Sequence, residues 1–123
     1  MPFTYTTRDE RKYWVAEMDD LQGLTVFTPG VYINSKYKGR AKFSTYVHEW
    51  LHMEFPHWKH ERVYDLEESL VDILWTCRKT LCFEDVRMAI NIICKNWRKR
   101  PRLGLEDQLW TYLCSAGYIR DEP

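Results

Sequence analysis

The sequence predicts an α+β fold, in which a small N-terminal antiparallel sheet of about three strands packs on a helix hairpin and two further helices follow. Short runs rich in β-branched and aromatic residues, separated by Gly and Pro, fill residues 1–38. Apolar residues then recur at helical spacing over residues 40–77 and 83–117, and Pro56 divides the first of these stretches. The chain of 123 residues is long enough for a single domain with one core.

Three strands are expected near the N-terminus. The segment 12–18 is aromatic and β-branched, the segment 24–27 follows a glycine, and the segment 31–34 follows the turn signal Thr28-Pro29-Gly30. Together these runs indicate a small antiparallel sheet.

Four helices are expected after the sheet. The first two cover residues 40–54 and about 58–77. The last two cover about 83–97 and 105–116, where Gly117 is a suitable C-terminal cap. The predicted apolar stripes are Phe43, Val47, Trp50 and Leu51 on the first helix, and Val63, Leu66, Leu70, Ile73 and Leu74 on the second.

The first helix carries the motif HExxH at residues 48–52. Its two histidines, His48 and His52, lie one turn apart on the same face of a helix, where both imidazoles can bind one Zn²⁺ ion. Glu49 can take a proton from a zinc-bound water and act as the general base of a peptidase. The motif therefore predicts one zinc ion per chain and hydrolysis of a peptide or protein substrate.

A catalytic zinc usually has three protein ligands, so a third ligand must follow the motif. If the two helices form a hairpin around Pro56, Glu61 lies level with His52 and becomes the expected ligand, with His60 and Glu68 as alternatives. Asp65 then lies level with His48 and is expected to accept a hydrogen bond from it, as carboxylates beside metal-bound imidazoles do.

Further residues near the motif are candidates for stabilising the developing oxyanion, a role that a hydrolytic site usually fills with hydrogen-bond donors. These candidates are His57, His60 and Tyr64. The strand that ends at Asn34 could bind an extended peptide by adding it to the edge of the sheet.

Several segments around the motif resemble the small gluzincin-like zinc metallopeptidases called minigluzincins, many of which are uncharacterised proteins of bacteriophages and bacteria. The resemblance lies in Gly30-Val31-Tyr32-Ile33-Asn34, Lys38-Gly39, Tyr46 to His52, Phe55-Pro56, His60 to Val63 and Leu74-Trp75. It implies a strand before the HExxH helix, zinc ligation by His48 and His52, a catalytic base at Glu49 and a glutamate ligand on the next helix. It covers roughly residues 24–75, and the chain departs from such enzymes in being short for a deep substrate cleft.

The composition also indicates which other partners and compartments are expected. Lys plus Arg and Asp plus Glu are both 18, so overall charge does not attract the chain to nucleic acid or to an anionic membrane. No apolar run is long enough to span a bilayer, and the N-terminal residues lack a signal-peptide pattern. The cysteines at positions 77, 82, 94 and 114 form no CxxC motif and are expected to be reduced, which favours the cytoplasm, the host's if the chain is encoded by a phage.

Two other functions remain open. The chain could bind zinc without catalysis and act by binding another protein, for example a host factor bound by a phage protein. It could also contact nucleic acid through a basic segment with an interleaved Trp, whose candidate residues are Lys95, Trp97, Arg98, Lys99, Arg100 and Arg102.

Overall fold

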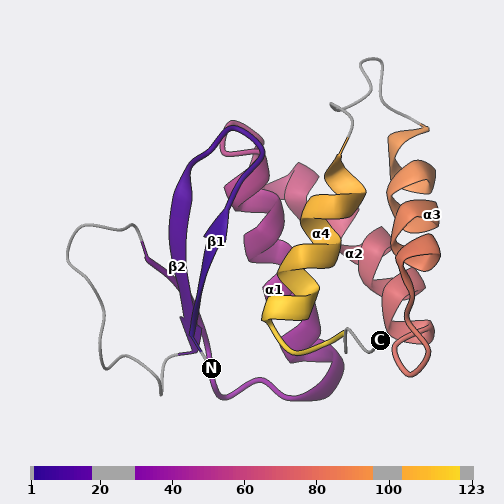
Figure 1. The fold of residues 1–123 in the computed structure, drawn as a ribbon, viewed down its shortest axis with the longest axis horizontal. Coiled ribbons are helices and arrows are strands. Elements are labelled where there is room, and N and C mark those ends of the chain that lie inside the picture. The colour runs from indigo at the N-terminus through magenta and orange to yellow at the C-terminus, as the bar shows by residue number, and fades with distance from the viewer. Residues whose placement is uncertain (1, 18–29, 96–103, 120–123) are drawn as a thin grey trace.

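The structure is a computed structural model that describes residues 2–17, 30–95 and 104–119. Within these ranges it contains a sheet followed by four helices, as the sequence predicts (Figure 1). The strands are β1 (Phe3–Thr6), β2 (Lys12–Glu17) and β3 (Gly30–Ile33), and the helices are α1 (Gly39–Glu54), α2 (His60–Thr76), α3 (Phe83–Cys94) and α4 (Leu105–Ser115). The strand predicted at 24–27 and most of its turn signal lie outside the described residues.

The sheet is mixed, whereas the sequence was expected to form an antiparallel one. Its order is β1-β2-β3, with β1 antiparallel to β2 as a hairpin and β3 parallel to β2. Strand β1 was not predicted. A parallel neighbour needs a connection of about a dozen residues, and residues 18–29 provide that length between β2 and β3. The predicted antiparallel pairing was therefore wrong for β3.

The helix boundaries lie within two residues of the predicted ones, except that α3 ends at Cys94 and not near residue 97. Helix α1 ends at Glu54, just before Pro56, because proline disfavours a helical conformation in the residue before it. Helix α4 ends at Ser115, and Gly117 lies just beyond it as the predicted cap, with a φ of 89° that is easily reached only by glycine. The backbone N–H of Gly117 donates to Cys114 O at 3.1 Å and that of Tyr118 to Leu113 O at 2.9 Å, which is the hydrogen-bond pattern of a Schellman cap.

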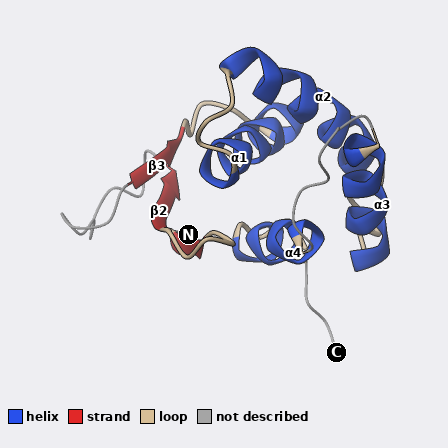
Figure 2. Ribbon diagram, turned by 90° about the horizontal axis from the view of Figure 1, so that it is seen from above, coloured by secondary structure: helices blue, strands red, loops and turns tan. Residues whose placement is uncertain are grey.

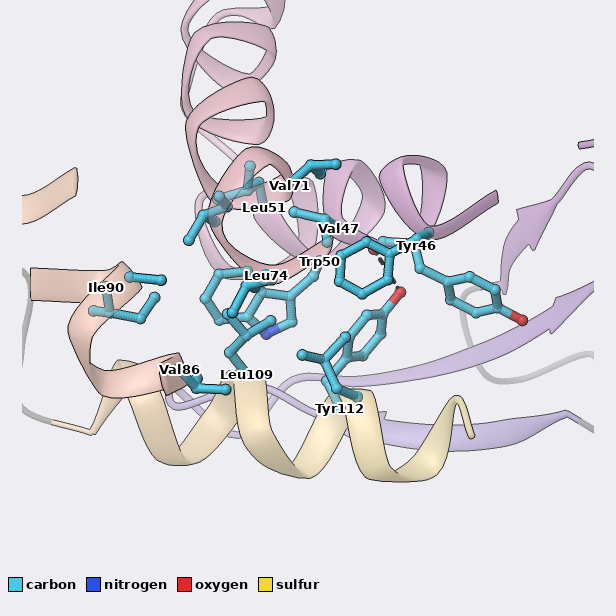
Figure 3. Close-up of a cluster of buried hydrophobic side chains, with 14 of the residues drawn as sticks. Tyr46, Val47, Trp50, Leu51, Val71, Leu74, Val86, Ile90, Leu109 and Tyr112 are labelled. Carbon is cyan, nitrogen blue, oxygen red and sulfur yellow. Dashed lines mark hydrogen bonds between the residues drawn. The ribbon is translucent and has the colours of Figure 1, made fainter. Parts of the chain in front are cut away.

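The sheet lies at one end of the molecule and α3 at the other, with α1 and α4 between them (Figures 1 and 2). Side chains from all four helices meet at Trp50, which is fully buried (Figure 3). The labelled partners come from α1 (Tyr46, Val47 and Leu51), α2 (Val71 and Leu74), α3 (Val86 and Ile90) and α4 (Leu109 and Tyr112). Since α1 contributes its apolar stripe to this core, its opposite side is left for the motif histidines.

A buried polar network fixes the C-terminal end of α1 against β1 and α4. The side chain of Glu54 is 1% exposed and accepts hydrogen bonds from Tyr5 Oη at 2.6 Å and Gln108 Nε2 at 3.2 Å. Arg8 Nε lies 3.4 Å from the other oxygen of this carboxylate, and Trp50 Nε1 donates to Tyr5 Oη at 2.8 Å. The buried charge of Glu54 is thus paired and hydrogen-bonded, as a buried carboxylate must be.

Candidate metal centre

The two motif histidines face one another across one turn of α1. Their Nε2 atoms lie 3.0 Å apart and their ring centroids 4.5 Å apart. Two nitrogens that share a tetrahedral zinc ion, at about 2.0–2.1 Å each, are separated by about 3.3 Å. The pair formed by His48 and His52 is therefore within a few tenths of an ångström of the spacing that a shared zinc ion needs.

The third member of the site is His60, the first residue of α2. Its ring centroid lies 4.8 Å from that of His48 and 4.9 Å from that of His52. One ligand atom from each of the three histidines lies within 4.8 Å of the other two. The three side chains could thus hold a metal ion, and among the described residues they form the one group that could.

The expected ligand Glu61 lies outside this group. With 3.6 residues per turn, Glu61 points about 100° around α2 from His60. Its side chain instead lines a shallow surface pocket of about 600 Å³. The other residues of that pocket are His57, Trp58, Lys59, Arg62 and Asp65. The geometry therefore favours the alternative ligand, His60, over Glu61.

Two other predicted positions also lie away from the three histidines. His57 is an exposed residue of the pocket beside Glu61, and Glu68 is exposed on α2 and is absent from the histidine group. Tyr64, in contrast, is one turn after His60, and its ring centroid lies 4.9 Å from that of His48 and 4.7 Å from that of His60. The residue is 53% exposed, so it lies between the histidines and solvent-accessible surface.

A carboxylate that the sequence did not single out approaches His48. Oε1 of Glu67 lies 2.8 Å from Nδ1 of His48, and the two side chains are 13% and 12% exposed. Nδ1 is buried and makes no hydrogen bond among the described residues, although this carboxylate oxygen lies so close to it. Glu67 thus occupies the position beside His48 that was predicted for Asp65, which is exposed.

The electrostatics of Glu49 and His52 suit a metal site. Burial raises the pKa of the Glu49 carboxyl above its ordinary value, Glu67 raises it further, and His48 and His60 oppose the rise. Burial, followed by the neighbouring histidines, lowers the pKa of His52. A lowered pKa keeps an imidazole neutral, the form that binds a metal ion, and a raised pKa makes Glu49 a better proton acceptor near neutral pH.

The turn between α1 and α2 positions His60. Phe55 and Trp58 stack with their ring centroids 3.9 Å apart and their planes 5° from parallel. The guanidinium of Arg62 lies 4.5 Å from the centre of the Trp58 ring, so the stack continues onto α2. Because α2 begins two residues after Trp58, this stacked turn helps to fix where His60 meets α1.

The face of α2 that meets α1 explains which of its polar residues join the site. The buried residues Val63, Leu70, Val71 and Leu74 mark this inward face. Positions 60, 64 and 67 lie on or beside this face, since they are three, four or seven residues from these apolar positions. This placement was the available sequence signal for Glu67.

Nucleic-acid binding by the basic segment stays a prediction. Of its six candidate residues, Lys95 is described, directly after α3, and the other five lie outside the described residues. None of the described helices has both the length and the apolarity to cross a membrane.

Comparison of the chain with models of known families, with characterised proteins and with solved structures found no match.

Proposed function

We propose that this protein is a zinc-dependent hydrolase of peptide bonds, with His48, His52 and His60 as the metal ligands and Glu49 as the general base. The observation that carries the proposal is the meeting of three imidazoles with the glutamate of an HExxH motif. Three nitrogen ligands that leave a coordination position open are a donor set typical of catalytic zinc.

The metal would supply Lewis acidity and would lower the pKa of a bound water from about 15.7 to about 7. Glu49 would accept the proton of the attacking water and deliver it to the leaving amine. The hydroxyl of Tyr64 would donate a hydrogen bond to the oxyanion, since its ring lies beside two of the three ligands and is open to solvent.

The proposed substrate is an extended peptide that adds to β3. In the described part of the sheet, β3 is an edge strand, and it leads into α1 through residues 34–38. An edge strand offers unpaired backbone groups to an incoming strand. A proline at Tyr32 would remove one backbone N–H and should weaken peptide binding; unchanged binding would remove β3 from the proposal.

The first experiment is elemental mass spectrometry of the protein purified without a metal-binding tag. We expect about one zinc per chain in the wild type, as the single three-histidine group implies. His60→Ala should lose the metal and the adjacent variant Glu61→Ala should retain it. Loss in Glu61→Ala with retention in His60→Ala would reverse the assignment of the third ligand.

Catalysis is tested next with a peptide library whose products are read by mass spectrometry. Glu49→Gln should keep the metal and lose cleavage, because an amide cannot accept the proton. A wild-type protein that binds zinc but cleaves no peptide would contradict the peptidase proposal and indicate a metal-binding interaction protein instead.

A further inference from the structure

A surface cavity of about 390 Å³ lies at the other end of α2 from the candidate metal centre. It is lined by residues 78–81, in the turn that follows α2, and by residues 117–119, in the segment that follows α4. Helix α2 has 17 residues, which span about 25 Å at 1.5 Å per residue, and His60 is the first of them. The cavity is therefore separate from the three histidines.

The polar part of the lining is cationic. Arg78, Lys79 and Thr80 supply a guanidinium, an ammonium and a hydroxyl group, and none of the described lining residues is acidic. Within the described part of the chain, the side chains of Lys79 and Thr80 have no ion pair or hydrogen bond. The chain carries no net charge, so this excess of positive charge is local. Donors and cations without a neighbouring carboxylate favour an anionic ligand.

An aromatic row connects the two segments that line the cavity. Cζ of Arg78 lies 4.3 Å from the centre of the Trp75 ring, and its Nη1 donates to Trp75 O at 2.9 Å. The Trp75 ring centroid lies 5.7 Å from that of the buried Phe43, which in turn lies 4.8 Å from that of Tyr118. These contacts hold Arg78 and Tyr118 in place before a ligand arrives, which lowers the cost of binding.

The size and the apolar lining of the cavity indicate more than a bare ion. Its volume falls at the lower end of the range of about 300–1,000 Å³ that is typical of small-molecule pockets. Leu81, Tyr118 and Ile119 add apolar surface beside the cations. A phosphate monoester carries close to two negative charges at neutral pH, which matches the two cations, and its organic part can cover the apolar lining.

We propose that this cavity binds a small phosphate monoester, with the phosphate group held by Arg78, Lys79 and Thr80 and the organic part packed against the apolar lining. The proposal does not rest on the proposed hydrolase function. Its test needs no metal ion.

The test is a ¹H–¹⁵N NMR titration of the full chain with glycerol 3-phosphate, in the presence of a chelator so that no metal ion competes for the phosphate. We expect saturable shifts of the backbone resonances of residues 78–81 and 117–119, and no such shifts with glycerol. Inorganic phosphate should bind more weakly, because it lacks the part that covers the apolar lining.

Lys79→Ala is the main variant, since Arg78→Ala would also remove the stack on Trp75. Loss of one charged contact with the phosphate should raise the dissociation constant about tenfold. Thr80→Val should also raise it, and Lys36→Ala, at an exposed position outside the cavity, is the matched control that should bind like the wild type. All three variants should keep the wild-type urea midpoint, because substitutions at exposed positions change stability little.

Three results would count against the proposal. An absence of shifts at residues 78–81 would overturn it. Shifts that do not saturate, or equal effects of Lys79→Ala and Lys36→Ala, would show an adventitious ion only and would also overturn it. Inorganic phosphate that binds as tightly as glycerol 3-phosphate would overturn the assignment of an organic ligand.

Discussion

The hydroxyl of Tyr5 offers a sharp test of the polar network at the end of α1. This oxygen donates to Glu54 at 2.6 Å and accepts from Trp50 Nε1 at 2.8 Å, and both contacts are buried. Tyr5→Phe removes one hydrogen bond to a charged group, worth about 1.5–3 kcal/mol, and leaves the Trp50 N–H without an acceptor, at a cost of about 1–3 kcal/mol. Gln108 and Arg8 still contact Glu54 in this variant, so the buried carboxylate keeps hydrogen-bond partners. We therefore expect the free energy of unfolding to fall by about 3 kcal/mol.

The assay is urea unfolding followed by tryptophan fluorescence. With a slope of about 1.5 kcal/mol/M, a loss of about 3 kcal/mol lowers the midpoint by about 2 M with the slope unchanged. Tyr13→Phe is the matched control, since Tyr13 pairs with Tyr5 across β1 and β2 but its hydroxyl accepts from the partly exposed Arg11. That variant should lose less than about 1 kcal/mol. Equal losses in both variants would refute the view that Glu54 and Trp50 depend on this hydroxyl.

Three further predictions follow from the metal site and the edge strand. Zinc at about 100 times its dissociation constant should stabilise the fold by about 2.7 kcal/mol and raise Tm by about 10 °C in a thermal scan, and His60→Ala should abolish the rise. In the metal-free protein the pKa of His52 is lowered, so below about pH 6.5 the unfolded chain binds more protons than the folded protein does, and the free energy of unfolding should fall as the pH falls. The raised pKa of Glu49 acts in the opposite direction. Glu49→Gln should therefore make the fall steeper, as measured by urea unfolding at several pH values. Gly30→Ala should move the Tyr32 ring, because the ring lies where a Cβ on Gly30 would be. The measurement is an NMR spectrum of the aromatic side chains, and unmoved Tyr32 resonances would contradict this packing.

The helices could be predicted from the sequence because their signals are local. Pro56 and Gly117 act on their own neighbours, and the apolar stripe of α1 repeats within a few residues, so three of the four predicted helices end within one residue of the structure. The pairing of β3 depends instead on which strand it meets after residues 18–29, and no local pattern records that choice. The network of Tyr5 and Glu54 was missed for the same reason, since its members are 49 positions apart in the sequence.

The place of a side chain on a helix hairpin depends on its height along the helix and on its direction around the helix, and the prediction of Glu61 used the height alone. Counting residues from the turn gives the height of a side chain along α2, and by height alone Glu61 and Asp65 match His52 and His48. The direction around the helix decides contact, and by direction His60 joins the histidine cluster and Glu67 lies beside His48. That direction was readable from α2 itself, because Val63, Leu70 and Leu74 define the buried face and positions 60 and 67 continue it at intervals of seven. The contacts agree with this direction, since His60 lies with His48 and His52 and Glu67 lies beside His48.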